Sequence, residues 1–205
     1  RLARELARVA CDAGGHVIVG RCHDAERILP FRPWVEALRS GGLLGHREGL
    51  AQLAPVGRME LARLFPELAP DAPAGAPTEN VLQLFEALAR LILDAAARAP
   101  LTIVLEDLQW ADEMSLRFLS FLAHRSDDRP LLVAVTARDE ETDDVPLLGR
   151  VFRELDRESR LLRLPLAPLG RAATDSLVAA LAPSSAGNAA LAVLAARVWR
   201  LSEGN

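Results

Sequence analysis

Two consecutive acids, Glu106 and Asp107, follow a nearly continuous apolar run at residues 101–105. Such a run is typical of a strand covered on both faces, as in parallel sheets. In open parallel sheets, ligands bind just beyond the carboxyl ends of the strands. One carboxylate there can hold Mg²⁺ together with phosphate oxygens, and a second can orient and polarise an attacking water. The alternative is a pair of solvated acids, since short motifs carry a risk of false matches.

The elements that position these acids form one strand–helix–strand unit over residues 101–136. A second apolar run at residues 131–136 predicts another strand. Between the two strands, Asp112 is the predicted N-cap of a helix that reaches about Ala123. A unit of this kind normally forms a right-handed parallel crossover. The sequence therefore predicts an α/β fold in which the acids lie at the carboxyl edge of a parallel sheet.

The remaining elements are predicted from apolar spacing and from the positions of glycine and proline. Helices are expected near residues 1–13, 34–39, 47–54, 57–65, 81–95 and 147–155, and strands near 16–20 and 160–166. Thr78 is the predicted cap of the helix near residues 81–95. Residues 171–182 and 186–201 form two further helices with no strand between them. The change from alternating strands and helices to helices alone predicts a core domain at residues 1–167 and the start of a helical subdomain at residues 168–205.

Composition and charge restrict the functions that this segment performs. The 205 residues carry a net charge of −4 with no basic stripe, which argues against nucleic-acid binding by the segment itself. No run approaches the ~18 apolar residues of a membrane helix, and no signal peptide opens the chain. The expected location is therefore the cytoplasm. All 24 basic Lys/Arg side chains are arginines, so the chain supplies no lysine to any mechanism.

The other side chains with catalytic or metal-binding chemistry lack a suitable spacing. Cys11 and Cys22 form neither a zinc spacing nor a disulfide framework, and we expect both to be reduced and structural. The four histidines show no metal spacing and no paired nucleophile: His16, His23, His46 and His124. The acid pair at residues 106 and 107 is therefore the strongest candidate site.

The residues after the acid pair read Leu-Gln-Trp-Ala-Asp at 108–112. Together with the apolar run and the acids, this string resembles the Walker B segment of the signal-transduction ATPases with numerous domains. That family is related to the AAA and Orc-like ATPases. Residues 20–22 and 29–39 resemble the stretch after the family's second strand, and residues 135–138 resemble its sensor strand. Residues 201–205 resemble the beginning of a Gly-Asn-Pro motif that lies near the adenine.

The resemblance assigns roles to individual residues of the core. Glu106 occupies the Mg²⁺-ligand position, where aspartate is more usual, and Asp107 occupies the position that activates water. Arg138 occupies a sensor position, from which a guanidinium reaches the γ-phosphate. From its neighbours alone, Arg138 is instead a surface arginine paired with one of the acids at residues 139–141.

The resemblance also covers the residues that flank these positions. Gly204 and Asn205 occupy the nucleotide-binding positions near the adenine, although by themselves they are a flexible tail. Trp110 and Ala111 are expected to pack the following helix rather than to touch nucleotide.

For the whole chain, the resemblance implies a three-layer P-loop NTPase core of the AAA type with the start of a helical lid. It implies that the intact protein binds ATP with Mg²⁺ and hydrolyses it slowly, as a switch in which ATP closes the lid on the core. The expected partner is an output domain outside this chain: a LuxR-type DNA-binding domain, a nucleotide cyclase or a kinase. This places the module in signal transduction or transcription regulation. Nucleotide-dependent self-association is also consistent with the family.

One departure from the family concerns the start of the chain. The family's first strand and its Gly-rich loop, which ends in a lysine and a serine or threonine, would precede Arg1. Without that loop, residues 1–205 are expected to bind nucleotide weakly or not at all. Two alternatives stay open. One is a nucleotide-free scaffold or partner-binding module with a degenerate ATPase fold. The other is an Orc-like DNA-loading ATPase, which the acidic charge disfavours.

Overall fold

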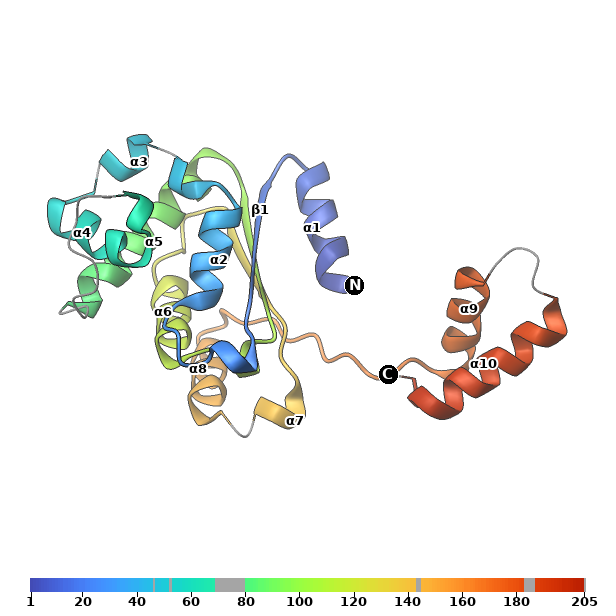
Figure 1. Ribbon diagram of the computed structural model, residues 1–205. Coiled ribbons are helices and arrows are strands. Elements are labelled where there is room, and N and C mark those ends of the chain that lie inside the picture. The colour runs from blue at the N-terminus through green and yellow to red at the C-terminus, as the bar shows by residue number, and fades with distance from the viewer. Residues whose placement is uncertain (46, 52, 69–79, 143–144, 183–186, 205) are drawn as a thin grey trace. The chain divides into compact units, whose positions relative to one another are not determined.

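Three parallel strands form the centre of the computed structural model, which describes residues 1–45, 47–51, 53–68, 80–142, 145–182 and 187–204. The strands are β1 (His16–Arg21), β2 (Leu101–Glu106) and β3 (Leu131–Val135), in the order β1-β2-β3 (Figure 1). Both strand pairs are parallel, and β2 is buried from Leu101 to Leu105. The predicted parallel α/β fold is confirmed, including the continuous burial of the strand that leads to the acid pair.

Ten helices surround or follow the sheet in the described part of the chain. They are α1 (Leu2–Asp12), α2 (Arg32–Ser40), α3 (Arg47–Ala51), α4 (Pro55–Leu64), α5 (Val81–Arg98), α6 (Glu113–Ala123), α7 (Asp139–Thr142), α8 (Pro146–Arg157), α9 (Arg171–Leu181) and α10 (Asn188–Ser202). Four short 3-10 turns join them: Asp24–Glu26, Leu43–Gly45, Pro66–Leu68 and Leu108–Trp110. None of the helices in these ranges is long and apolar enough to cross a membrane.

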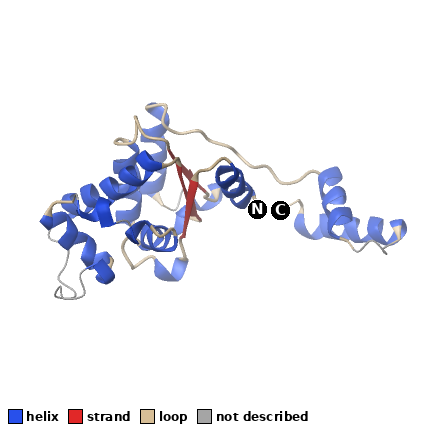
Figure 2. Cartoon of the chain, turned by 90° about the horizontal axis from the view of Figure 1, so that it is seen from above, coloured by secondary structure: helices blue, strands red, loops and turns tan. Residues whose placement is uncertain are grey.

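The helices cover both faces of the sheet. Helix α1 packs on one face, and α2, α5 and α6 lie on the other, as two perpendicular views show (Figures 1 and 2). This is the three-layer arrangement predicted for the core. The chain divides into two compact units, Arg1–Leu161 and Leu162–Asn205, whereas the boundary was expected between residues 167 and 168. The second unit contains α9 and α10, which pack against each other. Its identity as the start of a lid stays a prediction.

Side-chain caps fix the starts of two helices. Asp112 Oδ1 accepts a hydrogen bond from the Ser115 N–H at 2.9 Å, so the predicted cap of α6 is confirmed. Helix α5 begins after Asn80, whose side chain accepts a hydrogen bond from the Gln83 N–H at 3.2 Å. The predicted cap of this helix, Thr78, lies outside the described residues.

The strand predicted at residues 160–166 is wrong. These residues form neither helix nor strand, and the alternating leucines Leu162, Leu164 and Leu166 are 82%, 67% and 76% exposed. The alternation has the two-residue period of a strand, but a strand also needs a neighbour to complete its hydrogen-bond ladder. The strand pairs of the described structure are β1–β2 and β2–β3 alone, so no ladder includes this segment.

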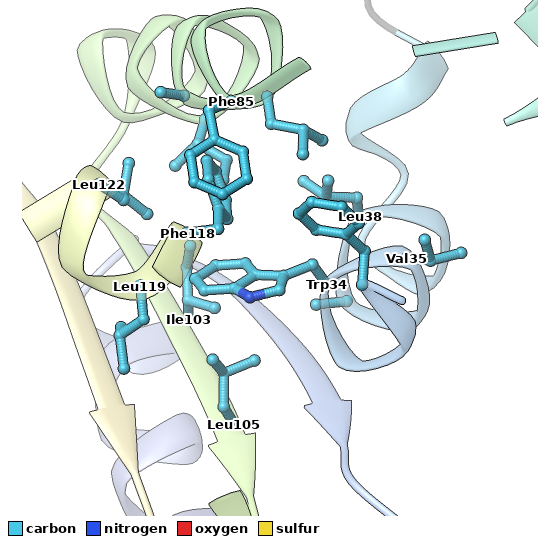
Figure 3. Packing of buried hydrophobic residues seen from close by; sticks show 14 of the residues in the cluster. Trp34, Val35, Leu38, Phe85, Ile103, Leu105, Phe118, Leu119 and Leu122 are labelled. Atoms are coloured by element: carbon cyan, nitrogen blue, oxygen red, sulfur yellow. The ribbon is translucent and has the colours of Figure 1, made fainter. Parts of the chain in front are cut away.

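An aromatic cluster forms the core between α2, α5, α6 and the sheet (Figure 3). Trp34 is fully buried, and its ring meets the Phe118 ring edge-on at a centroid distance of 4.8 Å. The Trp34 Nε1–H donates to the Ser115 carbonyl oxygen at 3.2 Å, so its one polar atom is satisfied. Ile103 and Leu105 of β2 point into this cluster (Figure 3). The core therefore holds the strand that carries the acid pair against the helices.

Gly20, near the end of β1, allows α2 to approach the sheet. A Cβ atom at this position would lie 1.9 Å from the Pro33 carbonyl oxygen, which belongs to the backbone and has little room to move. We expect Gly20→Ala to lower the free energy of unfolding by about 3 kcal/mol, the upper part of the usual range for overpacking. Urea unfolding of the 205-residue chain measures this loss. Gly45→Ala is the matched control, because a Cβ there meets nothing within 4 Å; equal midpoints for the two variants would contradict the prediction.

Candidate functional site

The carboxyl ends of the three strands meet at one edge of the sheet. The register pairs Arg21 with Glu106, and Leu105 with Val135, so the residues that follow each strand emerge together. Glu106 ends β2, Asp107 follows it, and Arg138 comes three residues after the end of β3. The structure therefore places the acid pair at the carboxyl edge of the sheet, as predicted, and brings Arg138 to the same edge.

Asp107 has a backbone conformation that is uncommon for a residue with a side chain. Its φ of 58° and ψ of 49° lie in the left-handed region, which aspartate tolerates better than most residues. Such a conformation costs on the order of 1 kcal/mol and persists when its surroundings enforce it. Here the Asp107 N–H donates to Thr136 Oγ1 at 3.0 Å, and the Leu108 N–H donates to the Thr136 carbonyl oxygen at 2.8 Å. Thr136, directly after β3, thus fixes the turn that presents Asp107.

Glu106 forms an ion pair with the strand beside it. The Arg21 Nε–H donates to Glu106 Oε2 at 2.6 Å, and the Glu106 side chain is only 24% exposed. This hydrogen bond, reinforced by the charge of Glu106, raises the pKa of Arg21, so the guanidinium stays charged. The sequence did not predict this partner. Arg21 and Glu106 are 85 positions apart in the chain, and they meet only through the register between β1 and β2. A cation that binds Glu106 must therefore displace Arg21 or share the carboxylate with it.

Gln109 connects the acid pair to the segment after β3. Its side chain is buried, with Nε2 donating to Asp107 Oδ1 at 3.5 Å and Oε1 accepting from the Arg138 N–H at 3.3 Å. Sequence reasoning assigned no role to this residue. Because a buried amide needs partners for both its ends, Gln109 ties the position of Asp107 to that of the Arg138 backbone.

Arg138 extends from this edge over Trp110. Its guanidinium carbon lies 5.4 Å from the centroid of the Trp110 ring, and one guanidinium N–H group donates to Glu141 Oε1 at 2.8 Å. The pairing with Glu141 is the alternative that the sequence left open. The side chain is 57% exposed, so it keeps access to a solvent-borne ligand. The sensor role of Arg138 stays a prediction.

The residues around Arg138 pack as the sequence suggested. Trp110 is partly buried against the core, and Ala111 is 5% exposed at the start of the segment that leads to α6. Both therefore pack within the first unit, and the expectation that neither touches nucleotide stays a prediction.

Cys22 lies beneath this edge as a buried thiol. Its N–H donates to the Glu106 carbonyl oxygen at 3.0 Å, continuing the β1–β2 pairing by one residue. Burial, and then the charges of Asp112, Asp107 and Glu36, raise the pKa of the thiol to about 12. The thiol is protonated at neutral pH and is no nucleophile. Cys22 and Cys11 are both free, as predicted.

The donor set at this edge fits the chemistry of a magnesium–phosphate site. Mg²⁺ prefers oxygen ligands and needs one or two carboxylates in addition to water and phosphate oxygens. Glu106 and Asp107 offer two partly exposed carboxylates from adjacent residues. Arg21 is the competing cation at the first of them.

Gly204 belongs to the second unit and has a structural reason to be glycine. Its φ is 91°, its N–H donates to Ser202 Oγ at 3.2 Å, and its carbonyl oxygen accepts from the Leu169 N–H at 2.8 Å. A Cβ at this position would lie 2.2 Å from the Leu169 carbonyl oxygen. Asn205 lies outside the described residues. The predicted nucleotide contacts of Gly204 and Asn205 therefore stay predictions.

The comparisons with known proteins agree with this architecture. A family model described as the AAA ATPase domain matches residues 1–134, a stretch that contains β1, β2, the acid pair and α6. No curated protein and no solved structure matches the chain.

Proposed function

The chain belongs to the AAA ATPase domain family, and from this premise we propose that it is the ATP-binding and hydrolysing switch module of a multidomain signalling or transcription regulator. The family makes it a nucleotide-hydrolysing module of the P-loop class. The observation that carries the hydrolytic assignment is the acid pair at the carboxyl end of a buried parallel strand. The proposal includes an output domain outside residues 1–205, such as a DNA-binding domain, a cyclase or a kinase, a cytoplasmic location, and nucleotide-dependent self-association.

In the proposed reaction, Asp107 orients the attacking water. Its carboxylate accepts a hydrogen bond from the water and takes up a proton as the oxygen attacks the γ-phosphorus and ADP leaves. Thr136 and Gln109 hold this residue through the backbone N–H and the side chain. Such positioning matters because phosphoryl transfer depends on in-line placement of the nucleophile.

Glu106 is the residue proposed to hold Mg²⁺ through its carboxylate. When bound with ATP, Mg²⁺ would neutralise charge on the phosphate oxygens. Arg21 keeps the Glu106 carboxylate in place at this edge through the 2.6 Å contact. The Arg21 side chain is 48% exposed, so the guanidinium can move into solvent when a divalent cation competes for the carboxylate.

Arg138 is proposed to report the γ-phosphate, and a paired set of variants tests this role in the full-length protein. We expect Arg138→Ala to reduce the preference for ATP over ADP about tenfold, since charge-assisted bonds to phosphate contribute about 1.5–3 kcal/mol. Equilibrium binding of the two nucleotides measures the ratio. Glu141→Gln is the control, because it removes the ion pair and leaves the guanidinium in place. If both variants change the ratio equally, the ion pair rather than a phosphate contact accounts for Arg138.

The switch itself is tested by comparing the full-length protein with MgATP and with MgADP. Hydrogen exchange of the amides in α9 and α10 is expected to be slower with MgATP, because the proposed closure protects the lid. A hydrolysis-deficient Asp107→Asn background keeps ATP intact during labelling. Identical exchange in the two nucleotide states would contradict a switch.

One observation favours a second function, a nucleotide-free scaffold. The Glu106 carboxylate already has a cationic partner in Arg21, so the charge of this acid is balanced without a metal ion. In a scaffold, this pair would join β1 to β2 and the edge would present a protein-binding surface. The two functions differ in one property, because a scaffold has no affinity for ATP in the full-length protein.

A further inference from the structure

One histidine and two glutamates converge where α6 and α8 end. The nearest ligand atoms of His124, Glu154 and Glu158 all lie within 4.8 Å of one another. His124 follows α6, Glu154 lies in the last turns of α8, and Glu158 follows that helix. No metal spacing was predicted for His124, because its partners are contributed by a helix about thirty residues further along the chain. This cluster is separate from the carboxyl edge of the sheet and takes no part in the proposed hydrolysis.

Both nitrogens of the His124 ring have a partner, and Nε2 is the one that faces the carboxylates. Nδ1 lies 2.6 Å from the Ser120 carbonyl oxygen, which only accepts, so Nδ1 carries the hydrogen. Nε2 faces Glu158 Oε2 at 2.9 Å. A ring held in this way, with Nδ1–H on a backbone carbonyl and Nε2 directed at carboxylates, has the orientation found for metal-bound histidines.

The two glutamates place negative charge on one side of this nitrogen. Their spacing of four residues puts them on the same face of α8, where like charges repel each other in the absence of a cation. Glu154 Oε2 is 3.5 Å from the Ser120 hydroxyl, which holds it toward α6. Arg160 Nε contacts Glu158 Oε2 at 3.3 Å, and the other guanidinium nitrogens of Arg160 pair with Asp127. Glu154, Glu158, Asp127 and Arg160 together carry a net charge of −2 when the His124 ring is neutral, which one divalent ion would balance.

We propose that His124, Glu154 and Glu158 bind a divalent transition-metal ion of the zinc class that joins α6 to α8. One imidazole nitrogen and two carboxylates are a ligand set that zinc accepts, with water in the fourth position. The ion would sit at a helix–helix contact already made by packing, so its effect is to stabilise the first unit.

A proton competes with the metal for His124 Nε2. The Ser120 carbonyl, and then Glu158 and Glu154, raise the pKa of His124 against the opposing effect of burial. The binding experiment is therefore made at about pH 8, where more of the ring is neutral.

The test is a calorimetric titration of the metal-free 205-residue chain with Zn²⁺. The expected result is saturable binding of one ion per chain, with a rise in the thermal midpoint. His124→Ala, Glu154→Gln and Glu158→Gln are each expected to weaken binding at least tenfold. His23→Ala is the matched control, because His23 is exposed and belongs to no such cluster among the described residues.

Three results would overturn the proposal. The first is that the unmodified chain shows no saturable Zn²⁺ binding. The second is that His124→Ala binds Zn²⁺ as the unmodified chain does, and the third is that His23→Ala loses as much Zn²⁺ affinity as His124→Ala. Co²⁺ absorption of the unmodified chain supplies an independent readout if a variant does not fold: ligand-field bands of a low-coordinate site are expected, and the spectrum of hexaaqua Co²⁺ would contradict the site. Asp107→Asn is expected to bind Zn²⁺ as the unmodified chain does. Zn²⁺ binding and ATP hydrolysis therefore test the two proposals independently of each other.

Discussion

Asp107→Asn in the full-length protein is expected to lower MgATP hydrolysis by about 10²–10⁴-fold, the range for loss of a positioned general base. The amide keeps the size of the side chain and the backbone contacts of residue 107 with Thr136. It loses the negative charge that polarises water and accepts a proton. ATP affinity is expected to change little, because the residue acts on water rather than on the phosphates. Single-turnover hydrolysis and equilibrium ATP binding, measured on the same preparation, separate the two effects.

Asp128→Asn is the matched control for this experiment. Asp128 is exposed and precedes β3, so it lies at the opposite edge of the sheet from the acid pair. It is expected to leave hydrolysis unchanged. Hydrolysis by Asp107→Asn at the rate of the unmodified protein would remove Asp107 from the mechanism, and equal losses in both variants would point to a general effect of charge.

Trp34→Ala is expected to lower the free energy of unfolding of the first unit by about 3–5 kcal/mol, as for other large aromatic truncations in cores. Trp34 is fully buried between α2, α6 and the sheet, and its removal leaves a cavity beside Phe118. It also leaves the Ser115 carbonyl oxygen without the indole donor. Urea unfolding of the 205-residue chain, followed by circular dichroism, measures the shift in the first-unit transition.

Two further variants separate the contributions of Trp34. Trp34→Phe keeps most of the packing and loses the hydrogen bond, so a smaller loss of about 1 kcal/mol is expected from that bond. Trp199→Ala, in the second unit, is expected to leave the first-unit transition in place. An unfolding midpoint of Trp34→Ala equal to that of the unmodified chain would contradict the central position given to this residue.

The parts of the fold that the sequence predicted depend on short-range patterns. The apolar run of β2, the acids after it and the Asp112 cap are each set by residues within one element. The same holds for the helical spacing of α9 and α10. Local patterns of this kind need no knowledge of the partner element, which explains why these predictions agree with the structure.

The features that the sequence missed depend on contacts between distant elements. The Arg21–Glu106 pair requires the β1–β2 register, and the link through Gln109 requires the β3 segment to lie beside the turn after β2. The His124 cluster requires the packing of α6 on α8. At residues 160–166 the sequence predicted a strand that the structure does not contain. The alternation there is strand-like, but a strand does not form without a hydrogen-bonding neighbour.

The most direct test of the central claim is the equilibrium binding of ATP to the full-length protein, with and without Mg²⁺, by titration calorimetry. An ATPase switch built on the acid pair predicts one ATP per chain and tighter binding in the presence of Mg²⁺. Glu106→Gln is expected to abolish the gain from Mg²⁺ while leaving metal-free ATP binding in place. No detectable ATP binding under either condition would contradict the account and favour the nucleotide-free scaffold.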